Sequence, residues 1–203
     1  MNIVIVDYGM GNIKSITSTL KYLGVTDVCL SSNYETLKSA DKIILPGVGS
    51  FGKAMKQIKE KKINIFLQEL INLKNIPLLG ICLGMQLLGM SSTEDGENKG
   101  LEFIDGNVIK FDNNLIKVPH VGFNQVEANH KSKLFKGLPK QPDFYFTHSY
   151  RMISLTNINQ SICTYGSEFV AGFEVRNIAG VQFHPELSQR NGLILLKNFI
   201  DKF

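Results

Sequence analysis

Residues 77–88 read PLLGICLGMQLL, which joins an apolar run, a sharp turn and the start of a helical pattern. The run 77–81 is short and apolar, as expected for a strand that is buried on both faces. Gly80 and Gly84 lie two places on either side of Cys82, so that neighbouring backbone can approach the turn closely. This is the cysteine counterpart of the G-x-S-x-G nucleophile elbow. The stretch therefore predicts a strand, a turn and a helix, with Cys82 at the tip of the turn.

The chain before this turn alternates between strands and helices. Continuous apolar runs at 2–8 and 42–46 predict buried strands. Apolar residues at helical spacing predict helices over 13–23, 50–60 and 63–73. Strands that alternate with helices are typical of a parallel sheet covered on both faces.

After about Gly100 the pattern changes to short strand-like runs whose turns carry Gly, Asn and Asp. These runs lie at 104–111, 143–150, 161–166 and 169–175. A buried strand at 178–186 and a helix at 192–203 follow them. We therefore expect one α/β domain over residues 1–203. It should have a mixed, mostly parallel central sheet with helices on both faces, and a smaller antiparallel part.

Composition and charge exclude several kinds of protein. The 203 residues carry 22 basic and 18 acidic side chains spread along the chain, without the concentrated basic surface of a nucleic-acid-binding protein. No uncharged apolar stretch approaches the roughly 20 residues that span a bilayer, and the first residues lack the features of a signal peptide. The three cysteines form no CxxC pair, which argues against a disulfide framework and a zinc site. We expect a cytoplasmic protein that needs no metal ion and binds neither nucleic acid nor membranes.

Cys82 has the surroundings of a nucleophile. A cysteine at the amino end of a helix is favoured as the thiolate, because that end carries partial positive charge. The amide of Leu83 follows directly and is a candidate oxyanion donor. The alternative is that Cys82 is a buried small hydrophobic residue, the usual role of a free cysteine. Cys29 and Cys163 have strand-like contexts that fit this alternative, whereas flanking glycines set Cys82 apart.

His184 and Glu186 are the candidate partners of the nucleophile. His184 ends a buried strand, and in extended chain the carboxylate two residues later points to the same side. That carboxylate can orient one ring nitrogen while the other faces the thiol, as in a catalytic triad. By itself His-Pro-Glu also fits an ordinary surface turn. For His120 and His148 structural hydrogen bonds are expected, and His130 is expected in an exposed loop.

Several segments resemble class I glutamine amidotransferases. GICLGMQ (80–86) and FHPE (183–186) are similar to the two active-site signatures of that family, and PGVGSFG (46–52) resembles its oxyanion loop. One branch is matched more closely, the glutaminase subunit of imidazole glycerol phosphate synthase. Its features appear in DYGMGN (7–12), VPHVGFNQV (118–126) and YFTHSYR (145–151). The resemblance covers nearly the whole chain and implies a flavodoxin-like sheet.

The resemblance implies a role for each matching residue. Cys82 would be the nucleophile, His184 the acid and base, and Glu186 the carboxylate that orients His184. The oxyanion hole would comprise Gly47, Val48, Gly49 and Leu83. Glutamine would contact Gly49, Gln86, Glu94, Ser149 and Tyr150. A (β/α)₈-barrel cyclase would form a heterodimer with the chain through Asn12, Pro119, His120, Phe123, Asn124 and Leu187.

No cofactor is expected. Gly9 and Gly11 match the first two positions of a dinucleotide-binding G-x-G-x-x-G motif, but Lys14 occupies the third. The ammonia released from glutamine would instead need a second subunit to use it.

Two residues depart from the branch pattern. Phe123 stands where the branch usually has tryptophan, and Leu187 where it has lysine. Both positions are associated with the partner, so a sugar-amidating synthetase of polysaccharide biosynthesis is the alternative acceptor of the ammonia. A cysteine peptidase and an inactive scaffold are further alternatives, which the small-substrate motifs and the intact triad residues disfavour.

Overall fold

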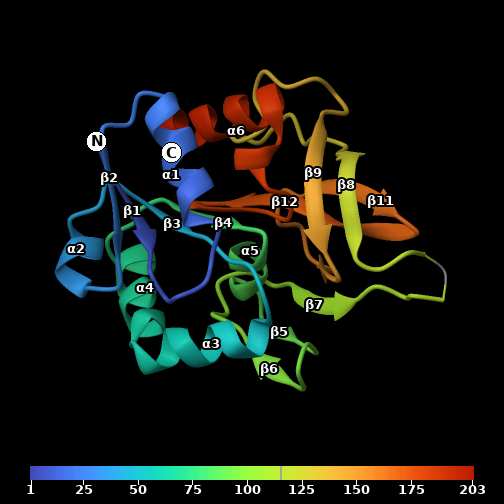
Figure 1. Cartoon of the computed structure of the whole chain (residues 1–203), viewed down its shortest axis with the longest axis horizontal. Helices are drawn as coiled ribbons and strands as arrows, with labels where there is room; N and C mark the ends of the chain where they lie inside the picture. The colour runs from blue at the N-terminus through green and yellow to red at the C-terminus, as the bar shows by residue number, and fades with distance from the viewer. Residues whose placement is uncertain (115) are drawn as a thin grey trace.

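The computed structural model describes residues 1–114 and 116–203, and its central sheet has the order β11-β12-β13-β4-β3-β1-β2 (Figure 1). The parallel strands are β1 (Asn2–Val6), β2 (Asp27–Ser31), β3 (Lys42–Leu45), β4 (Leu78–Ile81) and β13 (Ile178–Val181). At one edge β12 (Ser167–Val175) and β11 (Ser161–Tyr165) add antiparallel pairs. The expected mixed, mostly parallel sheet is confirmed.

Helices cover both faces of this sheet, as predicted (Figure 1). They are α1 (Ile13–Tyr22), α2 (Tyr34–Lys38), α3 (Phe51–Glu60), α4 (Ile63–Asn72), α5 (Leu83–Leu87) and α6 (Gln189–Lys202). Successive strand residues point to opposite faces, so Val4 joins the core under α3 and α4 while Ile5 joins the core under α1 and α6. Because both faces of the inner strands are buried, most of their positions are apolar and they read as continuous apolar runs.

The carboxy-terminal part differs from the prediction at residues 143–150, where one strand was expected. The chain instead forms β9 (Asp143–His148) and β10 (Tyr150–Ile153), which belong to different sheets. β10 pairs with β7 (Asn107–Lys110) in a small sheet that also contains β5 (Ser91–Ser92) and β6 (Asn98–Lys99). The break falls at Ser149 because the chain leaves one pairing partner and meets another there.

β9 pairs with β8 (His120–Gln125), a strand that the sequence pattern did not reveal. We call these two strands the β8–β9 ribbon. One face of the ribbon is buried and includes His120, Phe146 and His148, whereas Val121 and Phe123 are exposed. Glycine and polar residues interrupt the alternation of β8, which is why the pattern was weak.

The strand expected over 178–186 ends at Val181, and Pro185–Leu187 form a 3₁₀ turn, η1. The helix expected from residue 192 begins earlier, at Gln189. The carboxyl ends of parallel β1, β3, β4 and β13 meet at one edge of the sheet, where ligands of open α/β sheets bind. Among the described residues, no helix is long and apolar enough to cross a membrane.

Candidate active site

Cys82 lies at the turn between β4 and α5 with an unusual backbone conformation. Its φ of 54° and ψ of −112° lie outside the regions that non-glycine residues favour. Such strain is typical of functional sites, where the surrounding structure enforces it. The turn is held by the Cys82 amide, which donates to Val181 O at 2.8 Å, and by the Gln86 amide, which donates to Cys82 O at 3.2 Å.

The two glycines of the elbow have no room for side chains. A Cβ on Gly84 would lie 1.9 Å from Leu45 O, and one on Gly80 would lie 2.8 Å from Gly84 O. The predicted close approach of backbone around the turn is therefore confirmed. It brings α5 against β3 and orients the nucleophile candidate at the helix start.

His184 and Glu186 form the predicted pair. His184 Nδ1 lies 2.9 Å from Glu186 Oε1, and the same oxygen accepts a hydrogen bond from Asn12 Nδ2 at 3.2 Å. The Glu186 side chain is fully buried. The His184 backbone is fixed by its amide, which donates to Tyr145 O at 2.9 Å. Asn12, expected at the partner interface, thus also holds the orienting carboxylate.

The charge state of His184 is set by opposing effects. Burial lowers its pKa, but the neighbouring side chains of Cys82 and Glu186 outweigh burial and raise the pKa to about 10. Nε2 is buried and makes no hydrogen bond of ordinary length with any residue in the described ranges. The raised pKa favours the protonated imidazolium form of His184 beside Cys82.

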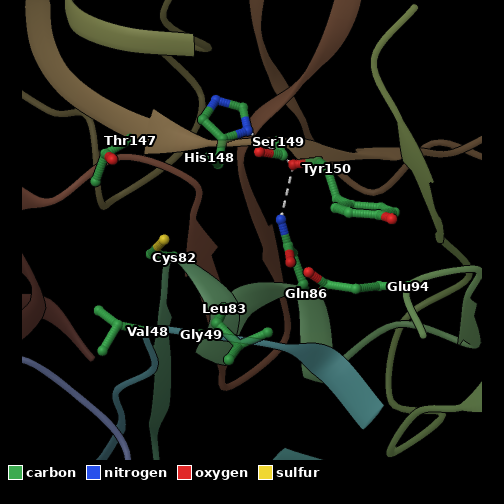
Figure 2. Close-up of a pocket in the computed structure, with 10 residues that line it drawn as sticks. All are labelled: Val48, Gly49, Cys82, Leu83, Gln86, Glu94, Thr147, His148, Ser149 and Tyr150. Atoms are coloured by element: carbon green, nitrogen blue, oxygen red, sulfur yellow. Dashed lines mark hydrogen bonds between the residues drawn. The ribbon is translucent and has the colours of Figure 1, made fainter. Parts of the chain in front are cut away.

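A cavity of about 210 Å³ opens beside Cys82. Figure 2 shows Cys82, Leu83 and Gln86 on one side of the cavity and His148, Ser149 and Tyr150 on the other. Val48 and Gly49 lie next to Cys82 and Leu83. All the residues predicted to contact glutamine line this cavity: Gly49, Gln86, Glu94, Ser149 and Tyr150. Segments far apart in the sequence therefore meet around one small, polar space.

The 46–50 loop is pressed against the elbow. A Cβ on Gly47 would lie 2.7 Å from Gly84 N and 2.6 Å from Tyr8 Oη, so only glycine fits. The Tyr8 hydroxyl donates to Pro46 O at 2.6 Å and holds the loop from below. Gly49 has a φ of +104°, which favours glycine. The loop thus places Val48 and Gly49 beside Cys82.

Glu94 reaches the cavity from the small sheet. Its Oε2 accepts a hydrogen bond from the Phe51 amide at 2.8 Å, at the start of α3. Burial raises the pKa of Glu94, the Phe51 hydrogen bond lowers it, and neighbouring Asp95 raises it further. A partly buried carboxylate on a cavity wall is suited to bind a cationic group.

The residues predicted for the partner interface do not share one environment. Phe123 and Leu187 are 50% and 41% exposed, and Pro119 is also exposed. Asn124 is half-buried and donates to Thr164 O at 3.2 Å. His120 is buried, so its side chain supports the surface from beneath.

The histidines expected to make structural hydrogen bonds do so. His120 Nδ1 lies 3.0 Å from His148 Nε2, and His148 Nδ1 lies 2.7 Å from Tyr150 O. Burial lowers the pKa of His120 to about 4 and that of His148 to about 3, where the Tyr150 bond raises it and nearby histidines lower it further. Both rings are therefore neutral near pH 7.

Of the other cysteines, Cys163 is buried as the alternative predicted, whereas Cys29 is only half-buried. Cys163 is buried in β11, and burial raises the pKa of its thiol to about 12. Cys29 lies in β2, and burial followed by the charge of Asp27 raises the pKa of its thiol. Among the described residues, no cluster of three or more His, Cys, Asp or Glu side chains could hold a metal ion.

Sequence reasoning missed two residues of the site. Gln182 is fully buried, and its Nε2 lies 3.8 Å from Cys82 Sγ. It precedes His184 by two residues in the segment that the sequence predicted as extended, so the period-two rule applied to His184 and Glu186 would have found it, although β13 ends at Val181 in the structure. Tyr8 was the second, and burial followed by the charge of Cys82 raises the pKa of its hydroxyl. No local signal in the sequence pointed to Tyr8.

Comparison with known proteins places this geometry in a family. The family model for glutamine amidotransferase class-I matches residues 4–203. The chain is 43% identical to the imidazole glycerol phosphate synthase subunit HisH 2 of Vibrio vulnificus, over 99% of this chain and 94% of that protein. It is 42% identical to subunit HisH of Aquifex aeolicus, over 98% and 96%.

Among solved structures, PurLQS from Thermotoga maritima is similar with a TM-score of 0.74 at 17% identity, covering 98% of this chain and 97% of that one. A glutamine amidotransferase from Thermotoga maritima has a TM-score of 0.65 at 18% identity, covering 100% and 83%. These likenesses show the fold, and the sequence matches show the descent. The chain belongs to the class I glutamine amidotransferase family.

Proposed function

We propose that this chain is the glutaminase subunit of imidazole glycerol phosphate synthase, acting in histidine biosynthesis. The observation that carries the proposal is that Cys82 with its strained backbone, the His184–Glu186 pair and the polar cavity occur together in one site. Relatives named as this subunit match nearly the full chain, which favours this function over supply of ammonia to a sugar-amidating synthetase. One class I domain over residues 1–203 carries the activity.

In the first step the Cys82 thiolate attacks the side-chain amide carbon of glutamine. The carbonyl electrons move onto oxygen, where amides of Leu83 and of the 47–49 loop stabilise the oxyanion. Protonated His184 then gives its proton to the amide nitrogen, the C–N bond breaks, and ammonia leaves. The products are ammonia and a glutamyl thioester on Cys82.

The second step uses the same histidine as a base. In the thioester the sulfur carries no negative charge, so one cause of the raised pKa of His184 is removed. Neutral His184 takes a proton from water, the hydroxyl adds to the thioester carbon, and the C–S bond breaks to release glutamate. The thiolate and the imidazolium are restored.

The cavity supplies contacts for both charged ends of glutamine. The Glu94 carboxylate binds the α-ammonium group, and the backbone near Ser149 and Tyr150 binds the α-carboxylate. Support comes from the position of all three on the cavity wall and from the lack of a lysine or arginine among the residues that line it. Gln86 and Gly49 complete the contacts with the bound amino acid.

Ammonia is protonated in bulk water and is then no longer a nucleophile, so a partner must receive it directly. We place a (β/α)₈-barrel cyclase over the face that carries Asn12, Pro119, Phe123 and Leu187, with Asn124 and His120 supporting it. Val48 of the 46–50 loop, which lines the cavity with Cys82, is also exposed. Apolar exposed side chains of this kind are typical of the centre of an interface.

The test is to reconstitute Cys82→Ala with the barrel cyclase and to supply either glutamine or an ammonium salt. Glutamine-dependent synthesis should fall by at least about 10³-fold, because the nucleophile is lost, while ammonia-dependent synthesis should survive. Cys29→Ala is the matched control and should retain both activities. Retention of glutamine-dependent synthesis by Cys82→Ala would contradict the proposal, as would failure of the wild-type chain to support the cyclase.

A further inference from the structure

We propose that Gln182 is a positioning residue: its side-chain amide donates a hydrogen bond to Cys82 Sγ, and a chain of hydrogen bonds from the Tyr150 carbonyl fixes that orientation. This inference rests on the proposed role of Cys82 as the nucleophile. It adds a residue that the triad and the oxyanion hole do not include.

Three contacts define the chain. Gln182 Nε2 lies 3.8 Å from Cys82 Sγ, a normal separation for a hydrogen bond to sulfur. Gln86 Nε2 lies 2.9 Å from Gln182 Oε1 and 2.9 Å from Tyr150 O. Both glutamine side chains are buried, so each polar atom needs a partner within the protein.

The polarity of this chain follows from the Tyr150 carbonyl. A carbonyl oxygen can only accept, so Gln86 must present its NH₂ group to it (Figure 2). The second hydrogen of that NH₂ group then points at Gln182, whose side-chain oxygen must accept it. The NH₂ group of Gln182 is left facing Cys82. A flip of the Gln86 amide would set its oxygen against two other oxygens, and a flip of the Gln182 amide would set two NH₂ groups against each other.

The Tyr150 carbonyl is itself held from a second direction. His148 Nδ1 lies 2.7 Å from it and must be the protonated nitrogen, since the carbonyl cannot donate. Neutral His148 therefore accepts at Nε2 from His120 Nδ1, 3.0 Å away. The β8–β9 ribbon and the elbow thus share one acceptor, which keeps the chain in a single orientation.

An N–H directed at sulfur favours the thiolate over the thiol and restricts the direction of the Sγ lone pairs. Other charged or titratable groups also face Cys82. They are His184 from the segment after β13, Tyr8 from the end of β1, Glu94 across the cavity and His148 from β9. The Tyr8 hydroxyl donates to Pro46 O and is not directed to sulfur. Within the described ranges, Gln182 is the uncharged side chain that donates to Sγ.

The proposal is tested by the pH dependence of Cys82 alkylation with iodoacetamide in the full-length chain, followed by mass spectrometry of the Cys82 peptide. Gln182→Met keeps a similar volume but removes the donor, and Gln182→Glu keeps the acceptor for Gln86 but places a carboxylate beside sulfur. The matched control is Gln68→Met. Gln68 is also partly buried and donates a hydrogen bond to Leu101 O at 2.7 Å, but it is not among the residues that line the cavity.

In Gln182→Met the pH of half-maximal alkylation should rise by roughly one unit, equivalent to about a tenfold slower reaction near neutral pH. Gln182→Glu should shift it further, and Gln68→Met should leave it unchanged. With the cyclase present, kcat for glutamine should fall about tenfold in Gln182→Met with little change in KM, because the lost bond acts on the nucleophile.

A wild-type pH profile in both Gln182 variants would overturn the proposal, even with reduced thermal stability, because that pattern indicates a purely structural role. If Gln182→Met does not fold, Gln182→Leu, which also removes the donor without adding charge, decides by the same profile. Alkylation needs no glutamine, so this result is independent of the Cys82→Ala reconstitution. A shifted alkylation profile without any glutamine-dependent synthesis would contradict the proposed function and leave the positioning role supported.

Discussion

The two walls of the cavity are built in different ways. One wall, residues 80–86, is a local turn in which glycines admit close backbone contact and Cys82 adopts a strained conformation. The other wall, residues 147–150, comprises the end of β9 and the two residues after it. Its conformation depends on hydrogen bonds with side chains from distant segments, including His120 and Gln86. We call them the elbow wall and the ribbon wall.

The difference shows how a reactive group and its surroundings can be specified separately. Strain at Cys82 is enforced by close packing of the turn against Leu45 and Val181 of the central sheet, neither of which belongs to the ribbon. The ribbon wall instead relies on buried neutral histidines and amides, whose protons have a single consistent arrangement. The elbow wall should therefore be sensitive to added volume, and the ribbon wall to charge and pH.

The largest contrast should come from adding one methyl group to the elbow wall and one to the β8–β9 ribbon. Gly84→Ala places a Cβ 1.9 Å from Leu45 O, and we expect it to lower the free energy of unfolding by about 3 kcal/mol or more. Gly122→Ala in the ribbon meets no atom within 4 Å and has only the backbone cost of its φ of +128°, about 1 kcal/mol. Urea unfolding measures both. Equal losses would contradict the steric account of the elbow.

Removing the carboxylate behind His184 should weaken the chemistry without abolishing it. In Glu186→Gln the negative charge that helps raise the pKa of His184 is lost and its hydrogen bond becomes one to a neutral acceptor, so less imidazolium is present to protonate the leaving amide nitrogen. We expect kcat for glutamine to fall on the order of 10²-fold. Exposed Glu60→Gln is the control and should retain wild-type kcat. A full loss equal to that of Cys82→Ala would mean that Glu186 does more than orient His184.

The exposed side of the ribbon should matter for the partner. Phe123→Ala removes a half-exposed ring that packs edge-on against Tyr145, and we expect the Kd for the barrel cyclase to rise about tenfold. Titration calorimetry measures it. Leu155→Ala, at a fully exposed leucine outside this face, should leave Kd unchanged. Equal Kd values for both variants would place the interface elsewhere.

Acid should weaken the ribbon wall gradually. The pKa values of His120 and His148 are lowered from 6.5 to about 4 and about 3. Since the unfolded chain binds protons first, their contribution to stability is present above pH 6.5 and is lost as pH falls toward those values. We expect a loss of roughly 1 kcal/mol per pH unit from each of the two histidines in this window.

Urea unfolding from pH 7 to pH 5 measures this slope. His148→Gln should be less stable than wild type at pH 7 but should lose stability less steeply on acidification. Exposed His130→Gln is the control and should keep the wild-type slope. A wild-type slope in His148→Gln would show that the buried histidine is not responsible.

Most of the amino-terminal fold was predictable because its signals are local. Apolar runs gave β1, β3 and β4, and helical periodicity gave α1, α3 and α4 within one or two residues. The short elements β2 and α2 were not predicted as such, since few residues carry their pattern. The single strand expected at 143–150 was wrong, because nothing in its composition marks the change of sheet at Ser149.

The sequence by itself determined Cys82, His184 and Glu186 as a candidate set, because glycine spacing and period-two geometry act over only a few residues. Only the tertiary structure brought Asn12 to Glu186, Tyr8 to the 46–50 loop, and Gln182 between Cys82 and Gln86. These contacts join residues more than 30 positions apart, and a hydrogen bond depends on separations of a few tenths of an ångström. Local patterns carry no information at that precision, so the packing of the sheet decides which side chains complete the site.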